Sequence, residues 1–321
     1  MQLSDLLSRV TVVGIPTRTN FRGVTVREIA LIKGKKRWSE FSPFKDYSVE
    51  RDALWLQAAL EAADQDFPTA AHSQVRVNAT LPEVPIAQVG EVLSWFPGCT
   101  TVKVKVGTTN DEERITEIFR IIPDARLRLD ANGLFSIQEA QDFLTSLYNK
   151  YGHKIEYVEQ PCASLAENAA LHLPIPLAID ENLRLGDDVG EINKVADVVV
   201  VKVAPLGGIT RALNIMSNLD KPVVISSALE SSVGLAAGIA VAAYLTEDVI
   251  CGLGTAALLD SDVVKKPLLP HNGFVSVEEI EIDEAAVARF QLSHEQVQWW
   301  HNRIAKAYEK NLANIERGQS Q

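Results

Sequence analysis

Short runs of β-branched residues alternate with stretches of helical periodicity along the chain after Pro68. Eight runs predict strands: Val75–Asn78, Val102–Val106, Leu127–Asp130, Ile155–Glu159, Leu177–Asp180, Val198–Val203, Val223–Ser226 and Cys251–Thr255. Seven stretches between them predict helices: Ile86–Phe96, Asp111–Ile121, Ser136–Tyr148, Leu165–Leu171, Gly186–Val195, Ile209–Leu219 and Val233–Leu245. This alternation predicts an α/β fold, a (β/α)7β TIM-like barrel. A doubly wound open sheet is the alternative, but the first strand-helix turn has no GxGxxG loop.

The first part of the chain follows a different pattern, in which short predicted strands, clearest at 24–26 and 29–32, are broken by glycine and proline. Ser48 then precedes acidic residues and the amphipathic stretch Ala53–Ala63, which is typical of a capped helix. Near the end of the chain, residues 293–310 predict a polar helix. We therefore expect an α+β capping domain over residues 1–72, the catalytic barrel over 73–270, and a C-terminal segment over 271–321 that packs on the cap.

Composition restricts the partners of the protein more than its fold. The chain has 321 residues, 46% of them hydrophobic, and a net charge of -11, which disfavours nucleic acid or an anionic membrane as a partner. Its three cysteines form no CxxC pair, and no apolar run is long enough to span a bilayer. Acidic residues come too early at the N-terminus for a secretory signal. We expect a cytoplasmic protein, a monomer or weak homo-oligomer, whose net charge does not exclude a small-molecule anionic substrate.

The stretch Thr101–Gly107, which reads TVKVKVG, carries the first sign of chemistry. Because alternate side chains of a strand leave opposite faces, Lys103 and Lys105 point one way and the three valines the other. If a helix covers the valines, both ammonium groups face the barrel interior. Desolvating two cations is costly unless anions compensate them, so carboxylates are expected nearby.

Three consecutive predicted strands end in such carboxylates, at Asp130, Glu159 and Asp180. Barrel active sites lie at the C-terminal ends of the strands. Neighbouring strands lie about 4.8 Å apart, so three carboxylates at this level need a cation between them. Oxygen ligands favour Mg²⁺, with Mn²⁺ as a substitute. Lys202, on the following strand, is expected to lie across the metal from Lys105.

The motifs Lys-x-Lys, Asp-x-Asn, Glu-Gln-Pro, Asp-Glu and Val-Lys on predicted strands two to six resemble the enolase superfamily, specifically its muconate-lactonizing-enzyme-like branch. The resemblance covers essentially the whole chain. It implies removal of a proton next to a carboxylate, with Mg²⁺ beside a lysine base. Similar stretches at 78–80, 226–234 and 252–255 imply a hydro-lyase of menaquinone biosynthesis. Its substrate would be a cyclohexadiene with a carboxylate, a hydroxyl and a succinyl arm, which loses water to become aromatic.

The resemblance also implies a role for individual residues. Lys105 is expected to be the base, Lys103 to tune it, and Lys202 to stabilise the anion as a cation over the ring. The expected substrate contacts are Arg22, Asn78, Ser226, Ser227, Gly254 and Thr255, and the expected supports of the metal ligands are Asn132 and Glu181, the latter paired with a lysine. The backbone amides that open the helix after Ser227 are expected to attract the succinyl carboxylate.

Several alternatives stay open at this point. Opposed Lys105 and Lys202 also suit a racemase of N-acylamino acids or a dipeptide epimerase, although we expect Asp260–Asp262, where some epimerases bind the substrate amine, to be an ordinary polar loop. The serines at 226 and 227 alternatively cap the next helix. The loop Arg18–Gly23 is either a lid or a plain hairpin turn. The six histidines fall outside the predicted strand ends, which argues against a histidine base. A non-catalytic scaffold with an inherited metal site is the remaining class.

Overall fold

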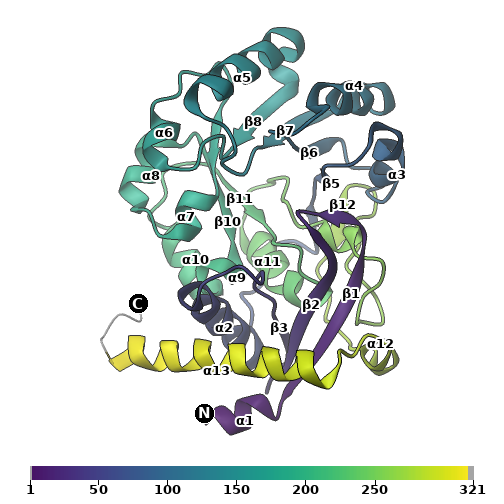
Figure 1. The fold of residues 1–321 in the computed structure, drawn as a ribbon, viewed down its shortest axis with the longest axis vertical. Helices are drawn as coiled ribbons and strands as arrows, with labels where there is room; N and C mark the ends of the chain where they lie inside the picture. The colour runs from purple at the N-terminus through teal and green to yellow at the C-terminus, as the bar shows by residue number, and fades with distance from the viewer. Residues whose placement is uncertain (1, 317–321) are drawn as a thin grey trace.

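The computed structural model describes residues 2–316, which form a cap and a curled parallel sheet (Figure 1). The centre of the cap is a three-stranded antiparallel sheet in the order β1-β2-β3. Its strands are β1 (Val10–Phe21), β2 (Val24–Lys33) and β3 (Trp38–Phe41), and the helices of the cap are α1 (Leu3–Leu7), α2 (Val49–Asp64) and α13 (His294–Glu316).

Strand β2 is continuous, so the expected break between residues 26 and 29 is wrong. The two polar residues at this point, Arg27 and Glu28, are buried and have partners elsewhere in the fold. The Glu28 carboxylate accepts a hydrogen bond from Trp300 Nε1 at 2.8 Å, and Arg27 Nε donates to the Leu229 carbonyl at 2.9 Å. Buried polar groups with partners do not interrupt a strand.

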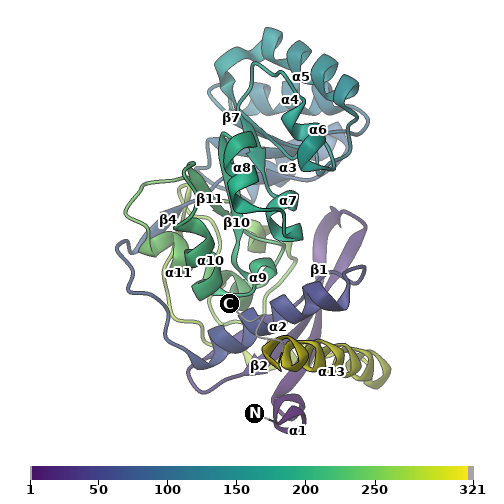
Figure 2. The same ribbon diagram turned by 90° about the vertical axis from the view of Figure 1, so that its left-hand side faces the viewer.

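The C-terminal helix α13 lies along α2, and together they cover one side of the cap sheet (Figure 2). Both helices bury large apolar side chains in one cluster, including Trp55 of α2 and Trp300 of α13. A buried ion pair joins the same helices, because Arg303 Nε lies 2.6 Å from Asp52 Oδ2. The end of the described chain therefore packs against its beginning.

Seven parallel strands follow one another around the second part, each paired with the next along the chain. They are β5 (Ala79–Leu81), β6 (Thr101–Lys105), β7 (Arg126–Asp130), β8 (Ile155–Glu159), β9 (Leu177–Ile179), β10 (Val198–Lys202) and β11 (Val223–Ser226). The intervening helices are η1 (Ile86–Gln88), α3 (Val89–Ser94), α4 (Asp111–Ile121), α5 (Ile137–Tyr151), η2 (Gly152–Lys154), α6 (Leu165–Ala169), α7 (Glu181–Leu185), α8 (Val189–Val195), α9 (Val203–Leu206), α10 (Ile209–Met216) and α11 (Ser232–Tyr244). The expected capped barrel is confirmed.

The first and last predicted strands of the barrel are wrong in detail. Residues 74–76 form β4 (Gln74–Arg76), which pairs antiparallel with β12 (Phe274–Ser276) outside the barrel. Residues 251–255 form no strand, and Thr255 begins the short helix η3 (Thr255–Leu258). Two isolated parallel bridges, Val77 to Cys251 and Ser226 to Gly252, close the barrel instead. We call this closure, residues 77, 226, 251 and 252, the seam.

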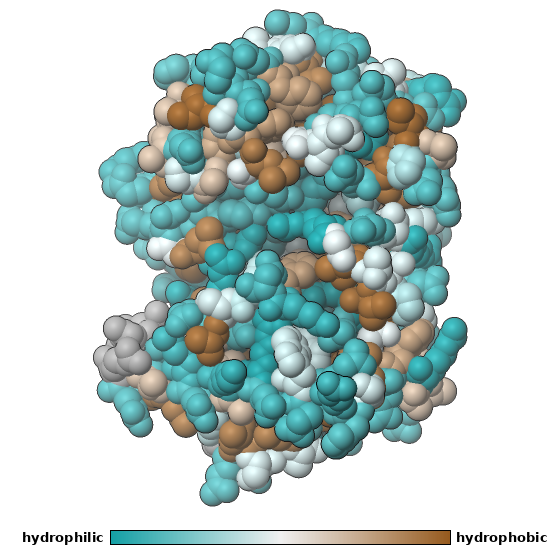
Figure 3. Space-filling model, viewed as in Figure 1, coloured by the Kyte–Doolittle hydropathy of each residue, from teal (hydrophilic) through white to brown (hydrophobic). Residues whose placement is uncertain are grey.

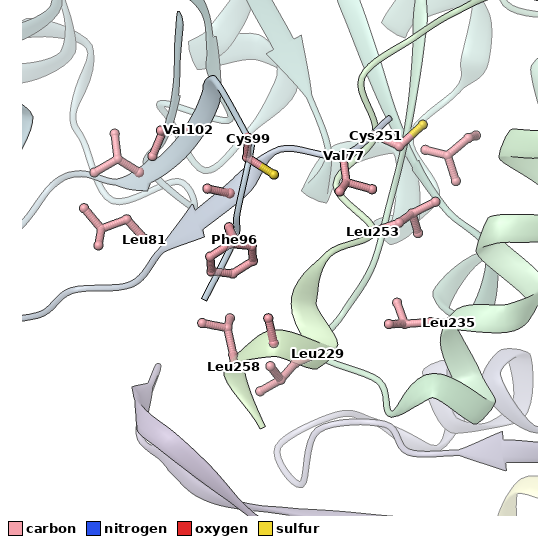
Figure 4. Close-up of a cluster of buried hydrophobic side chains, with 14 of the residues drawn as sticks. Val77, Leu81, Phe96, Cys99, Val102, Leu229, Leu235, Cys251, Leu253 and Leu258 are labelled. Carbon is pink, nitrogen blue, oxygen red and sulfur yellow. The ribbon is translucent and has the colours of Figure 1, made fainter. Parts of the chain in front are cut away.

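Gly252 explains part of the irregularity at the seam. A Cβ atom at this position would lie 2.4 Å from Ser226 Oγ, so the backbone approaches β11 more closely than an ordinary residue allows. Figure 4 shows the apolar side chains that pack behind this closure, with Val77 and Cys251 above Leu253 and Leu258. The seam is thus held by packing as much as by strand pairing.

One face of the molecule gives little sign of a large apolar contact area. In the view of Figure 3, hydrophilic side chains cover most of the face and apolar side chains form separate spots. The remaining helix of the described chain, α12 (Glu284–Arg289), lies between β12 and α13 in sequence. Within residues 2–316, none of the helices has the length and apolar character that crossing a bilayer requires.

Candidate active site

The two lysines of β6 point into the barrel, and the valines of the same strand point outward. Val102, Val104 and Val106 are at most 1% exposed. They belong to the main apolar cluster. Lys105 pairs in register with Asp130 of β7, which brings both side chains to the C-terminal end of the sheet. The structure therefore confirms the expected orientation of the lysine and valine side chains of β6.

The three carboxylates lie side by side at the same end. Asp130 pairs in register with Glu159 of β8, and Asp180 follows directly after β9. Each is at most 1% exposed. Parallel register alone produces this arrangement, since the strands end at the same level. Three buried carboxylates on neighbouring strands repel one another unless positive charge lies among them.

Three lysines supply positive charge to these carboxylates. Lys103 Nζ lies between two of them, 2.8 Å from Asp130 Oδ2 and 2.7 Å from Glu159 Oε1. Lys105 Nζ lies 2.6 Å from Asp130 Oδ2 on one flank. Lys202 Nζ lies 2.6 Å from Asp180 Oδ2 on the other. The structure thus brings together all six charged residues that the motifs single out.

The lysines leave part of the carboxylate surface without partners. Glu159 Oε2 and Asp180 Oδ1 are buried oxygens that make no hydrogen bond. An unpaired buried carboxylate oxygen is costly, and oxygen atoms of this kind are the ligands that Mg²⁺ prefers. Among residues 2–316, no three His, Cys, Asp or Glu side chains form a ready-made metal site. The donor set fits a hard divalent cation, and its use as a metal site stays a prediction.

The two flanking lysines differ in their acidity. Burial lowers the pKa of Lys105, and although Asp130 opposes this, the nearby charges of Lys103 and Arg22 lower it further. Burial is also the largest influence on Lys202, but the nearby carboxylates, Asp180 first and then Glu159, together outweigh it and raise the pKa of Lys202 above its ordinary value. The neutral amine is therefore easier to form at Lys105 than at Lys202.

The pKa values of the carboxylates are also shifted in different directions. Burial and the Asp130 charge raise the pKa of Glu159 to about 7, although Lys103 opposes them. Burial acts in the same sense on Asp130, but Lys103 and Lys105 outweigh it and hold the pKa of Asp130 below its usual range. Added positive charge next to Glu159 would favour its ionised form.

A small cavity lies above these groups, with room of about 40 Å³. Its lining residues include Lys103, Lys105, Asp130, Asn132, Lys202, Arg22, Ser226, Ser227 and Thr255. Asn132 Oδ1 accepts a hydrogen bond from Lys105 Nζ at 2.6 Å, so it orients this lysine. A volume of this size is close to that of one water molecule.

Two expected substrate contacts do not line this cavity. The Asn78 side chain accepts a hydrogen bond from Arg128 Nη1 at 3.1 Å and donates to the Ala79 carbonyl at 2.9 Å. A Cβ on Gly254 would meet Pro270, Asn78 and Phe96, none of which lines the cavity. The structure does not bring these two residues to the other predicted site residues.

The serines after β11 do not cap α11, so that alternative is wrong. The cap residue is Ser231, five positions after Ser226. Ser227 Oγ instead donates to the Gly252 carbonyl at 2.6 Å and lies 2.8 Å from Thr255 Oγ1. Ser226 and Ser227 therefore line the cavity from the β11 side of the seam, and Thr255 lines it from the other side.

The expectation that the first amides of α11 bind a substrate carboxylate is also contradicted. Protein carboxylates already hold these amides. Glu40 Oε2 accepts from Ser231 N and Gly234 N, each at 3.1 Å. Asp262 Oδ2 accepts from Ser232 N at 3.1 Å. Glu40, Asp262, Ser231 and Ser232 are all buried. An incoming anion therefore finds no free backbone N–H group there.

Glu181 pairs with an arginine, and the expected lysine partner is wrong. Arg184 Nη2 lies 2.8 Å from Glu181 Oε1, and Asn132 Nδ2 donates to the same oxygen at 3.1 Å. Arg184 also donates to Tyr47 Oη at 3.1 Å and lines the cavity. The motif-based reading missed Arg184, although its i+4 spacing from Asp180 was a signal.

Other cavity residues come from parts of the chain that motifs do not reach. Phe21, Phe44, Tyr47 and Thr80 line the cavity from the cap and from β5. Arg22 and Gly23 form the turn of the β1–β2 hairpin, so the loop is a hairpin turn whose first residue also covers the site. None of the six histidines is among the lining residues. Asp262 is bound to α11 and does not line the cavity, as expected of a structural loop.

Solved structures with this architecture support the fold. A muconate lactonizing enzyme from Pseudomonas fluorescens, solved with muconolactone, superposes with a TM-score of 0.75 at 18% identity, over 88% of this chain and 98% of that one. A probable mandelate racemase from Alicyclobacillus acidocaldarius gives a TM-score of 0.67 at 21% identity, over 88% and 95% of the two chains. At these identities the likeness concerns the fold alone.

Sequence comparisons are more specific. Residues 12–63 match the family described as enolase N-terminal domain-like, and residues 89–286 match the one described as enolase C-terminal domain-like. The o-succinylbenzoate synthase of Mycobacterium tuberculosis is 41% identical over 316 residues, which cover 95% of each chain. That of Mycolicibacterium smegmatis is 41% identical over 316 residues, with 95% of this chain and 97% of the relative covered. The chain therefore belongs to the enolase superfamily and, within it, to the o-succinylbenzoate synthases.

Proposed function

We propose that this protein catalyses the dehydration of a cyclohexadienecarboxylate with a succinyl arm to o-succinylbenzoate, the step that its family membership implies for menaquinone biosynthesis. The observation that carries the mechanism is the placement of Lys105 and Lys202 on opposite flanks of the carboxylates, 2.6 Å from Asp130 Oδ2 and from Asp180 Oδ2, and the pKa shifts, Lys105 lowered and Lys202 raised, fit unlike roles. A reaction with one base and one fixed cation needs this asymmetry. The protein would work in the cytoplasm, where its three free thiols stay reduced.

Lys105 acts as the base. As the neutral amine it removes the proton from the ring carbon next to the substrate carboxylate, and the electron pair of the C–H bond passes into the ring and carboxylate. The C–O bond to the ring hydroxyl then breaks, and the departing oxygen takes the proton back from Lys105 as water. Asn132, 2.6 Å from Nζ, keeps the amine in place, and Lys103 lowers its pKa.

Lys202 stays protonated on the other flank. Its ammonium group is held by Asp180 at 2.6 Å, and it lines the cavity opposite Lys105 across the carboxylates. A fixed cation in a buried site stabilises the negative charge that develops on the ring without any reorganisation of solvent. Lys202 therefore acts as an electrostatic catalyst and not as a second base.

Asp130, Glu159 and Asp180 would hold Mg²⁺, or Mn²⁺ as a substitute. The unpaired oxygens Glu159 Oε2 and Asp180 Oδ1 are the atoms that a cation would satisfy. When bound, the ion supplies a Lewis acid for the substrate carboxylate. The protein groups nearby orient the ligands, since Arg184 Nε lies 3.5 Å from Asp180 Oδ1.

The succinyl arm would lie against the hydroxyls of Ser226, Ser227 and Thr255, with Arg22 closing over it from the hairpin turn. These four residues line the cavity together. Since Glu40 and Asp262 occupy the amides of α11, hydroxyl groups and the Arg22 guanidinium are the donors that remain for the arm.

A racemase of N-acylamino acids is the second candidate, because Lys105 and Lys202 flank the carboxylates as a two-base exchange requires. Two equivalent bases should have similar pKa values, and here the shifts are opposite. We therefore rank this activity second. The Asp262 side chain, which an epimerase would need free for a substrate amine, is bound by Ser232 Oγ at 2.7 Å.

One experiment separates the two activities. The purified protein with Mg²⁺ is incubated with the cyclohexadiene substrate, and the aromatic product is followed by ultraviolet absorbance beside a racemisation assay of an N-acylamino acid. We expect aromatic product that disappears with EDTA and returns with Mg²⁺. Racemisation without aromatic product would replace the proposal by the second candidate. Neither activity, together with no solvent-deuterium exchange at any substrate α-carbon, would favour a scaffold.

A further inference from the structure

Arg27 of β2 crosses from the cap to the barrel. It is 3% exposed and does not line the cavity. Its Nε donates to the Leu229 carbonyl at 2.9 Å, and its Nη2 to the Ala228 carbonyl at 3.3 Å and to Ser42 Oγ at 3.1 Å. A planar guanidinium fixes several acceptors at once. Arg27 therefore holds two successive carbonyls of the loop that follows β11.

Glu40 of β3 holds the other end of the same loop. Its Oε2 accepts from Ser231 Oγ at 2.5 Å and from the backbone amides of Ser231 and Gly234, each at 3.1 Å. Its Oε1 accepts from Ser42 Oγ at 2.5 Å. A carboxylate at this place also suits the positive end of α11. Ser42 thus contacts both Arg27 and Glu40.

The segment that Arg27 holds forms one wall of the cavity. Ser226, Ser227, Ala228 and Leu229 all line it. Leu229 has a φ of 63°, a left-handed backbone conformation that is uncommon for a leucine and persists only when its surroundings impose it. Figure 4 shows its side chain next to Leu258 in the apolar cluster. Packing in this cluster and the hydrogen bond from Arg27 Nε to the Leu229 carbonyl hold the conformation.

We propose that Arg27 and Glu40 are positioning residues that set the shape of the succinyl-binding wall, residues 226–229, from the cap. The inference rests on the proposed function for the identity of the ligand. It assigns to the cap a role beyond covering the site: its sheet fixes the loop that holds the arm of the substrate. Neither residue touches the reacting atoms, so both act through the loop.

The contact between Glu40 and the first turn of α11 leaves no room for a side chain at Gly234. A Cβ on Gly234 would lie 2.9 Å from Glu40 Cδ and 2.7 Å from Glu230 Cβ. An alanine here must push the Glu40 carboxylate away from the first turn of α11. Gly90 of α3 offers a matched control, because a Cβ there meets only Ile121 Cδ1 at an ordinary 3.5 Å.

The test compares Arg27→Lys and Gly234→Ala with two controls. Arg114→Lys is the control for the loss of a buried arginine, since Arg114 is 2% exposed, donates to the Thr109 carbonyl at 2.7 Å and lies outside the cavity lining. Gly90→Ala is the control for the added methyl group. Measured are kcat, KM for the cyclohexadiene substrate, and the Kd of o-succinylbenzoate by calorimetry.

In the two test variants we expect KM and the Kd of o-succinylbenzoate to rise about 10- to 100-fold, the loss that a displacement of about 1 Å produces, with kcat falling less. The controls should keep both constants within about twofold. Equal constants in test and control variants of matched stability would overturn the inference. A fall in kcat alone would also overturn it, because the wall binds the arm and does not perform the chemistry.

If Arg27→Lys or Gly234→Ala does not fold, Ser42→Ala takes their place. It removes the hydroxyl that joins Arg27 and Glu40 and leaves both charges, so a smaller rise in KM and Kd is expected, and an unchanged Kd would overturn the inference. The wild-type protein decides the proposed function separately. Without aromatic product from wild type the proposed function fails, whereas active wild type with unaltered variants refutes the role of Arg27 and Glu40 alone.

Discussion

Two clusters of buried charge lie close to the cavity, and they differ in how completely their polar atoms are paired. The residues proposed to be catalytic, Lys103, Lys105, Asp130, Glu159, Asp180 and Lys202, form one cluster, which we call the catalytic cluster. The interface cluster comprises Arg27, Glu40 and Asp262. Both are buried to a similar degree. Burial alone therefore does not distinguish a reactive site from a structural one.

The pairing of the carboxylate oxygens does distinguish them. In the interface cluster, Glu40 accepts from Ser42, Ser231 and Gly234. Asp262 likewise accepts from Ser232 and Val263. In the catalytic cluster, Glu159 Oε2 and Asp180 Oδ1 accept no hydrogen bond, although Arg184 Nε lies 3.5 Å from the latter. A buried carboxyl group whose oxygens all accept hydrogen bonds serves the fold, whereas one with an oxygen that accepts none leaves room for a ligand. The following variants test that difference.

The largest effect is expected for Lys105→Ala. Loss of the general base should lower kcat by about 10²- to 10⁴-fold, while Mg²⁺ binding stays close to wild type because Lys105 is not a ligand. Turnover is followed by the ultraviolet signal of the product, and Mg²⁺ binding by calorimetry. More than a few percent of wild-type activity would remove Lys105 as the base.

The next largest effect is expected for the carboxylates of the catalytic cluster. Asp130→Asn, Glu159→Gln and Asp180→Asn should each weaken Mg²⁺ affinity by more than about tenfold. Even the mutation of a residue that only supports a metal ligand weakens metal affinity by about this factor. Calorimetric titration measures it. Asp262→Asn, from the interface cluster, is the matched control and should bind Mg²⁺ as wild type does. If one of the three variants binds Mg²⁺ with unchanged affinity, the residue it replaces is not a metal ligand.

A purely structural effect is expected for Asp262→Ala. The change leaves the buried donors of Ser232 and Val263 without an acceptor, which should lower the free energy of unfolding by about 3 kcal/mol. Urea denaturation measures the loss. A variant as stable as wild type would mean that the pairing of the interface cluster contributes nothing to the fold.

The smallest effect concerns pH. Burial raises the pKa of Glu40 to about 7, against the hydrogen bonds of Ser231 and Ser42 and the charge of Arg27. Between about pH 4.5 and 7 the folded state then binds more protons at Glu40 than the unfolded state, so its contribution to stability falls as pH rises. From about pH 5.5 to 7 this amounts to about 2 kcal/mol at 1.4 kcal/mol per pKa unit.

The check is the stability difference between wild type and Glu40→Gln at the two ends of that range. Wild type should lose stability relative to the variant as pH rises, because glutamine does not titrate. A difference that is the same at both pH values would show that the Glu40 carboxyl titrates below the range.

Much of the barrel could be predicted because local sequence patterns mark its strands. Strands β6, β7, β8 and β10 start within one residue of their predicted starts and end within one residue of their predicted ends, since their β-branched and leucine runs are bounded by turns. Their C-terminal residues include most of the charged groups of the catalytic cluster. Position along a parallel strand thus translates directly into position in the site.

The interface cluster could not be predicted in the same way. Arg27 lies 202 residues before Leu229, and Glu40 lies 191 residues before Ser231. No local sequence pattern indicates which cap residue contacts which loop. Nothing in the sequence near α11 shows that its first backbone amides already have acceptors. The antiparallel pairing of β4 with β12 is missed for the same reason, because its partners are about 200 residues apart. Arg184 is different, since its spacing from Asp180 was visible.

The seam gives the barrel two unequal halves. The charged groups of the proposed chemistry lie on or directly after the continuous strands β6 to β10. Ser226 pairs with β10 on one side and has only an isolated bridge on the other, and Ser227 and Thr255 lie beyond the ladder. Mutations near the seam therefore change backbone that few ladder hydrogen bonds constrain, and they leave the register of the catalytic strands alone. In evolution, such a division allows the set of accepted substrates to diverge among descendants while the proton-transfer groups are inherited unchanged.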